Sequence, residues 1–144
     1  MQAPYLLLMP LHMTKIAYGI DHPQELADRL AMRAQEWGGE ARIVTRYLPK
    51  RHEEMLDGSL YWIMDHVLVA RSPILGFEQR KEDGRWWIRL DPELIPVEGQ
   101  PKRAHQGWRY LEARDAPRDL PSGAVGDDVI PGKLLNELHR LALI

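Results

Sequence analysis

The sequence contains no cysteine. This absence excludes a disulfide scaffold, a thiolate nucleophile and every metal site with cysteine ligands. Long apolar runs are missing as well. The apolar run near the N-terminus covers only residues 5–8, which is too short for a membrane span or a signal peptide. We therefore expect a cytoplasmic protein without a membrane segment.

The chain also has little net charge. Its formal charge is −2 at pH 7, so any affinity for nucleic acid or anionic lipid must come from local patches. Catalytic signatures are absent too: there is no His-Glu-x-x-His motif, no Gly-rich phosphate loop and no Gly-x-Ser-x-Gly elbow. The histidines are scattered. The sequence therefore predicts neither metal nor cofactor, and it leaves open whether the protein is an enzyme.

What is present is the composition of a folded domain. The 144 residues are 44% hydrophobic and 28% charged, values typical of one packed domain, which we place at residues 1–144. A chain of this length buries enough surface to fold without disulfides or metals.

A helix is predicted over residues 21–37. Asp21 is placed to cap it, Pro23 falls in its first turn, and Gln24 is placed to complete a capping box. Gly38-Gly39 ends the pattern. The apolar residues at helical spacing, which we expect to pack on the core, are Leu26, Leu30, Ala34 and Trp37.

The remaining elements are mostly strands. Strand-like patterns cover residues 11–18, 41–48, 59–64, 67–78, 85–90 and 107–111. A short helix is a candidate at 50–56, and Glu82-Asp83-Gly84 predicts a hairpin turn with Gly84 at positive φ. Pro96, Gly99 and Pro101 indicate a loop, residues 112–128 an irregular crossing, and Pro131 the start of a last helix.

These elements predict an α+β fold. We expect a mainly antiparallel sheet or a small PUA-like barrel, with an N-terminal and a C-terminal helix packed on it, because the strands cluster and a regular βαβ alternation is missing.

A first basic segment covers residues 46–52. No acid interrupts the run of bases until Glu53, and an aromatic and a histidine lie among them; its members are Arg46, Tyr47, Lys50, Arg51 and His52, with Arg42 just upstream. Lysine and arginine neutralise phosphates, and an aromatic ring can stack on a base. The alternative is an ordinary solvated strand edge and helix start.

A second basic segment covers residues 102–110 and also contains no acid. On a strand, Trp108 and Tyr110 point one way while Arg109 points the other. The segment suits recognition of a phosphate or carboxylate, through Lys102, Arg103, His105, Gln106, Trp108 and Arg109. The alternative is that its aromatics are core and its arginines pair with acids such as Glu112 and Asp115.

Three further features each allow two interpretations. Trp86 is expected in the core, and Trp87 either under a helix or as an exposed stacking surface. Arg71 interrupts an apolar strand, so it either pairs structurally or lies in a pocket. Asp65-His66 suggests a catalytic dyad, but a kink between two strands is favoured, since neighbours on a strand point to opposite faces.

The sequence also resembles a known family. The likeness begins at Asp57-Gly58-Ser59-Leu60-Tyr61-Trp62-Ile63 and continues through Ala70-Arg71, Leu90-Asp91-Pro92-Glu93-Leu94, Pro101-Lys102-Arg103, Gln106-Gly107-Trp108-Arg109-Tyr110-Leu111 and Asp115-Ala116-Pro117. Together these motifs resemble the bacterial family called domain of unknown function 1489. The resemblance covers residues 11–120, leaves residues 1–8 outside, so that Met9 is an alternative start, and implies no activity.

The leading hypothesis is that the two basic segments converge on one face and bind RNA or another phosphate-bearing ligand. A second hypothesis is a small enzyme acting on an anionic metabolite or nucleotide, with Arg71, Arg103 and Arg109 holding the anion and His105 or Asp91 moving protons. A third is an interaction module that uses Trp87 or the C-terminal helix as its anchor.

Overall fold

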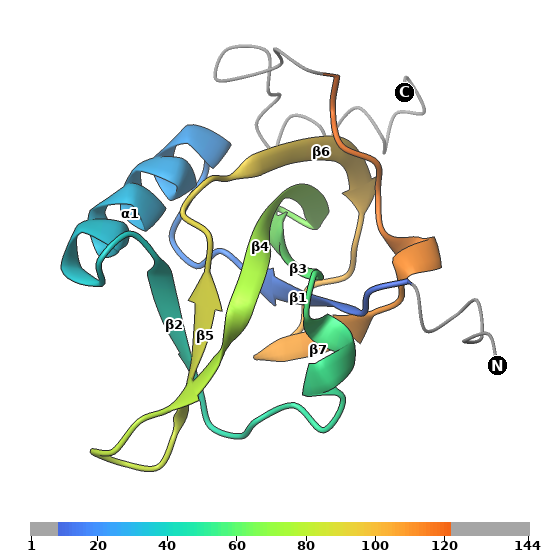
Figure 1. Cartoon of the computed structure of the whole chain (residues 1–144). Coiled ribbons are helices and arrows are strands. Elements are labelled where there is room, and N and C mark those ends of the chain that lie inside the picture. Colours follow the sequence, from blue (N-terminus) through green and yellow to red (C-terminus); the bar gives the residue numbers. More distant parts are fainter. Residues whose placement is uncertain (1–8, 122–144) are drawn as a thin grey trace, which may run out of the picture.

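The computed structural model describes residues 9–121 (Figure 1). In this part of the chain one α-helix accompanies seven strands and two short 3₁₀ turns. In chain order they are β1 (His12–Ile16), α1 (Pro23–Glu36), β2 (Ala41–Thr45), η2 (His52–Met55), β3 (Ser59–Met64), β4 (Val67–Gln79), β5 (Trp86–Leu90), β6 (Ile95–Pro101), β7 (Trp108–Leu111) and η3 (Ala113–Asp115).

The strands form one mixed sheet in the order β2-β5-β4-β3-β1-β7, with β6 also paired to β4. Only β1 and β3 run parallel within the described residues; the other pairs are antiparallel. A parallel pair needs a long crossover, and here α1 and β2 lie within it. The mainly antiparallel α+β prediction therefore holds at this coarse level. The predicted last helix, from Pro131, lies outside the described residues.

The long strand β4 organises the sheet. Its first half pairs with β3 on one side and β6 on the other, and its second half pairs with β5. The register shifts between Ile74 and Gly76, where the strand leaves its first partners, as expected of a β-bulge that bends a strand. Figure 1 shows the strand curving from β3 towards the β2–β5 end. The bend lets one strand serve two regions of the curved sheet.

Helix α1 covers one side of the sheet with Leu26 and Leu30, which are both buried. Its cap is not Asp21 as predicted but His22, whose Nδ1 accepts a hydrogen bond from the Gln24 backbone N–H at 3.0 Å. Pro23 explains the difference, because a proline at the first helical position leaves the preceding residue extended and in the cap position.

Trp37 departs from the prediction as well. It follows the last turn of α1 and is 39% exposed. Its ring lies against Trp87 instead, with the ring centroids 5.0 Å apart. Trp86 and Trp87 are both half-buried, whereas Ile88 and Leu90 on the same strand are buried. Trp86 is therefore not among the buried residues of the core, in which it is expected from the sequence.

The predicted loop from Pro96 to Pro101 is mostly strand. These residues belong to β6, whose described strand partner is β4. A proline is tolerated in a strand at the edge of a sheet, so the prolines did not prevent pairing. On the other side of β6, the Glu98 N–H donates to the Arg118 carbonyl at 2.7 Å.

Both hairpin turns follow from their residues. Gly84 has φ +74° in the β4–β5 turn, which confirms the predicted positive φ. Asp65 and His66 form the two-residue turn between β3 and β4, and both have positive φ, as in a type I′ turn. Asp65-His66 is thus a tight turn, in agreement with the structural interpretation.

Candidate functional site

The two outermost strands of the sheet path, β2 and β7, meet at a groove. Their ends contribute to one cavity of about 410 Å³, which we call the basic groove. It is lined by Lys15, Val44, Thr45, Arg46, Tyr47, Ile88, Gln106, Gly107, Trp108 and Arg109. Parts of both predicted basic segments therefore line one cavity.

Lys15 lines this groove from strand β1. In the strand registers it stands opposite Trp62 on β3 and opposite Trp108 on β7. Side chains of residues paired across strands lie on the same face of a sheet, so Lys15 is flanked by a tryptophan on each side. Its ammonium also lies 5.2 Å from the centre of the Tyr18 ring.

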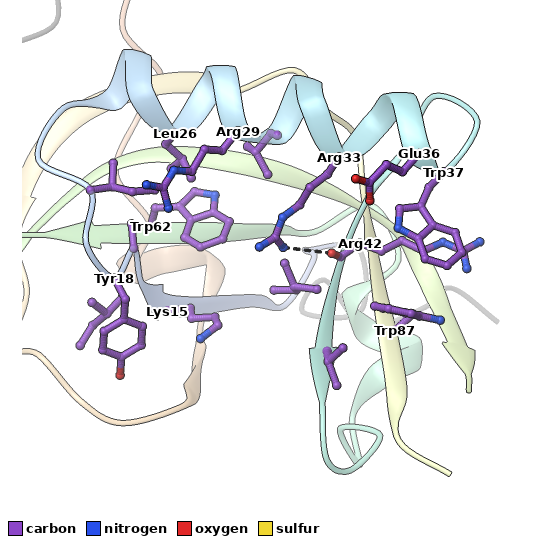
Figure 2. A pocket seen from close by; sticks show the side chains of 16 residues that line it. Lys15, Tyr18, Leu26, Arg29, Arg33, Glu36, Trp37, Arg42, Trp62 and Trp87 are labelled. Atoms are coloured by element: carbon purple, nitrogen blue, oxygen red, sulfur yellow. Dashed lines mark hydrogen bonds between the residues drawn. The ribbon is translucent and has the colours of Figure 1, made fainter. Parts of the chain in front are cut away.

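A second cavity, the helix cleft, lies between α1 and the sheet and has a volume of about 610 Å³ (Figure 2). It is lined by Lys15, Ile16, Ala17, Tyr18, Ile20, Leu26, Arg29, Leu30, Arg33, Glu36, Trp37, Arg42, Ile43, Val44, Trp62 and Trp87. Figure 2 shows Arg33 reaching from α1 towards the sheet. Lys15 and Val44 line both cavities, so the helix cleft and the basic groove adjoin.

The cations around these cavities fall into two groups. Arg42 pairs with Glu40 at 2.7 Å and with Glu78 at 3.0 Å, so it is neutralised within the fold. A second group, formed by Lys15, Arg33, Arg46 and Arg109, makes no ion pair with any carboxylate of residues 9–121. These four side chains supply the available positive charge.

Burial lowers the pKa of the Lys15 ammonium, and the positive charge of Arg33 lowers it further. The second cause places two like charges near one another. Holding two positive charges close together costs free energy, and an anion bound near both Lys15 and Arg33 would remove that cost.

His105 lies near this region, on the face of β1 opposite to Lys15. Its Nε2 lies 2.7 Å from the Thr14 hydroxyl on β1. Burial lowers the pKa of its imidazole, and nearby positive charges lower it further, those of Arg109, Lys102 and Lys15. The second basic segment is thus folded against β1, where its charges add to that of Lys15.

Arg51 links the two segments directly. Its backbone N–H donates to the Tyr110 hydroxyl at 3.2 Å, and its guanidinium lies 5.5 Å from the centre of the Tyr110 ring. The same guanidinium pairs with Glu54 at 2.7 Å and with Glu112 at 3.1 Å. Arg51 therefore holds the segments together but offers little free charge.

Arg71 lies apart from this region. Its guanidinium makes two hydrogen bonds of 2.8 Å to the Asp119 carboxylate and one of 2.8 Å to the Ser59 hydroxyl. It is not among the residues that line the basic groove with Arg109. Arg71 therefore has the structural pairing foreseen as one of its two interpretations.

Lys50 and Arg103, two other bases of the predicted segments, are exposed.

Family comparison agrees with the sequence motifs. The model of a family described as "Protein of unknown function (DUF1489)" matches residues 13–144. The chain belongs to this family. No curated protein and no solved structure matches the chain. In this DUF1489 chain, the motif Gln106-Gly107-Trp108-Arg109 lines the basic groove.

Two residues that complete the site, Lys15 and Arg33, were not identified from the sequence of this DUF1489 chain. Lys15 is the one Lys or Arg in strand β1, and only its pairing with Trp62 and Trp108 reveals its position. Arg29 and Arg33 offered a signal, since they lie four residues apart on one helix face. Arg29 is paired with Glu25 at 3.2 Å. Of these two arginines, Arg33 is therefore the one that resembles Lys15 in making no ion pair within residues 9–121.

Trp87 stacks mainly within the fold. The Arg42 guanidinium lies 4.6 Å from the Trp37 ring centre, and that of Arg80 lies 4.6 Å from the Trp87 ring centre. The contact between the Trp37 and Trp87 rings joins the end of α1 to the β4–β5 hairpin. One edge of Trp87 still lines the helix cleft.

Two other kinds of site find no support in residues 9–121. No group of three or more His, Asp or Glu side chains there is placed to hold a metal ion. No helix in that range is long and apolar enough to cross a membrane.

Proposed function

We propose that this protein binds a phosphate-bearing ligand in the basic groove, with single-stranded RNA as the first candidate. The observation that carries the proposal is the meeting of Lys15, Arg46 and Arg109, from distant parts of the chain, in one groove. None of the described residues that line this groove is acidic.

The groove has the chemistry that single strands require. Cations neutralise backbone phosphates, and aromatic side chains provide stacking surfaces for bases. Tyr47 is highly exposed and Trp108 half-buried, and both line the groove beside the cations. The low net charge of the chain is no obstacle, because the local potential depends on charges gathered in one place.

A fold-level analogy supports the same function. Small PUA-like barrels bind RNA through basic, aromatic faces, and we propose that this curled sheet acts comparably. What supports the analogy is that the outer strands β2 and β7 line a single groove. Fold alone does not fix function, so the side chains of the groove carry the proposal.

The enzyme hypothesis has less support. It requires Arg71, Arg103 and Arg109 to hold one anion, but Arg71 is bound to Asp119 and Ser59. A small phosphorylated ligand in the groove would share the chemistry of RNA, and binding experiments distinguish the two.

The test is fluorescence anisotropy with a short labelled oligouridine at low salt. Affinity should fall steeply as salt is added, because bound phosphates release counterions. The double variant Arg46→Ser/Arg109→Ser should bind more weakly, with a salt slope smaller by about 1.4, since each phosphate contact on a single strand contributes about 0.7.

The matched control is Lys81→Ser/Arg118→Ser, which removes two exposed bases that do not line the groove. It should leave the salt slope nearly unchanged. The proposal fails if the wild type has no affinity for RNA at low salt, or if both double variants lose affinity equally. Binding of inorganic phosphate or a mononucleotide with the same affinity as the oligomer would favour a small ligand instead.

A further inference from the structure

Neither Lys15 nor Arg33 makes an ion pair with a carboxylate of residues 9–121. Lys15 is half-buried on β1, and Arg33 lies on the facing side of α1. One Arg33 Nη donates to the Arg42 carbonyl at 3.1 Å, which fixes the guanidinium in the cleft and leaves other N–H groups free, since the group has five. Glu36 also lines the helix cleft, but it makes no ion pair with either cation.

The position of Lys15 divides the available space in two. On one side is the helix cleft and on the other is the basic groove, and Lys15 lines both. Each volume, about 610 Å³ and about 410 Å³, is that of a small-molecule site. A ligand with two bulky units and one central negative charge would match this division.

Both spaces also offer surfaces for planar rings. The helix cleft has an apolar floor that includes Ile20 and Leu26, and the exposed ring of Tyr18 lies beside it. The basic groove has Trp108, which stands opposite Lys15 across the β1–β7 pair. Stacking on aromatic side chains contributes about 1–3 kcal/mol per base to the binding of single strands.

We propose, on the basis of the proposed function, that a single strand is bound across Lys15. One nucleotide lies in the helix cleft, the next lies in the basic groove, and the phosphate that joins them lies between Lys15 and Arg33. The smallest complete ligand is therefore a dinucleotide, not a mononucleotide.

The test compares uridine 5′-monophosphate (UMP) with the dinucleotide uridylyl-uridine (UpU) as competitors against labelled oligouridine. UMP carries about −1.5 to −2 charges at neutral pH, whereas UpU carries a single phosphodiester charge. Attraction by charge alone therefore predicts that UMP competes better. Binding across Lys15 predicts the reverse, with UpU better by at least about tenfold, the equivalent of one stacked base.

The variants Lys15→Gln and Arg33→Gln should each remove most of the advantage of UpU, and each should lower the salt slope for oligouridine by about 0.7. Lys15→Arg retains the charge and should restore the advantage in large part. Lys81→Gln is the control for the loss of an exposed lysine. Thermal unfolding of each variant shows whether the half-buried Lys15 is also needed for folding, and a variant is compared only at temperatures where it is folded.

Three results would overturn the inference. If oligouridine binds but UMP competes as well as UpU, the ligand does not extend across Lys15, although the proposed function stands. If UpU keeps its advantage in Lys15→Gln and Arg33→Gln, the phosphate is held elsewhere. If no oligonucleotide binds at low salt, both the inference and the proposed function are wrong.

Discussion

Gly58 lies where two segments of backbone approach too closely for any side chain. A Cβ atom at this position would lie 2.2 Å from the Leu11 carbonyl oxygen and 3.0 Å from that of Met55. The shorter distance is more than about 1 Å below that of an ordinary van der Waals contact. Both obstacles are backbone atoms, so no change of rotamer can make room. Gly58→Ala must therefore move the main chain.

The surrounding hydrogen bonds resist that movement. The Gly58 N–H donates to the Met55 carbonyl at 2.8 Å, and the Gly58 carbonyl accepts from the Ile74 N–H at 2.9 Å. Overpacking of this kind costs about 1–3 kcal/mol, and each weakened hydrogen bond adds about 1 kcal/mol. We expect Gly58→Ala to lower the free energy of unfolding by about 3–5 kcal/mol, a large part of the 5–15 kcal/mol typical of a domain.

Urea denaturation followed by tryptophan fluorescence measures this loss as a lower midpoint at an unchanged m-value. The control is Gly19→Ala. Gly19 has φ +70° and open space around the position of a Cβ atom, so its replacement costs only the left-handed backbone penalty of about 1–2 kcal/mol. If Gly58→Ala is no more destabilising than Gly19→Ala, close approach is not the reason for a glycine at position 58.

Three further changes test other parts of the fold. Leu30→Ala removes a side chain that is 2% exposed and should cost about 2–5 kcal/mol, whereas Met32→Ala, at a position 67% exposed, should shift the denaturation midpoint little. Gly84→Val should be clearly less stable than Gly84→Asn, because the φ of +74° is tolerated by asparagine and not by a β-branched residue; equal midpoints would reject this reasoning. Burial, aided by the positive charge of Arg71, lowers the pKa of His12 to about 4. Between about pH 4 and 6.5 the unfolded chain therefore binds more protons than the folded chain. The free energy of unfolding should fall as the pH drops through that window, by at most about 1.4 kcal/mol per pH unit. His12→Asn keeps an acceptor for the Ser59 N–H and should flatten that dependence in urea titrations at pH 7 and pH 5, and an unchanged slope would exclude His12 as its source.

Local signals predicted the local structure. The spacing of Leu26 and Leu30 gave helix α1, and Gly84 gave the β4–β5 turn, because both depend on residues close together in the chain. The cap assignment failed by one residue. The rule that would have corrected it, the preference of Pro23 for the first helical position, is itself local.

Features that depend on distant partners were not predicted. Residues 95–101 have the prolines and glycine of a loop, but the first half of β4 had a free edge with which they pair. Likewise, the sequence showed two basic segments without showing that Arg51 is neutralised by Glu112, 61 residues away. Which charges are free is a property of the folded chain, and Lys15 acquires its importance only from the strands beside it.

The placement of β1 has a consequence for the order in which the molecule assembles. Met13 pairs with Leu60 on one side and with Tyr110 on the other, so the first strand of the sheet must wait for residues made much later. Closing such long loops is slow, since their entropy is lost before any contact compensates for it. During synthesis the backbone N–H and C=O groups at both edges of β1 therefore remain unpaired, and they can form hydrogen bonds with a strand of another chain. The basic groove, which needs β7, is among the last features to form, and a nascent chain ending before Gln106 would lack the groove residues from Gln106 to Arg109.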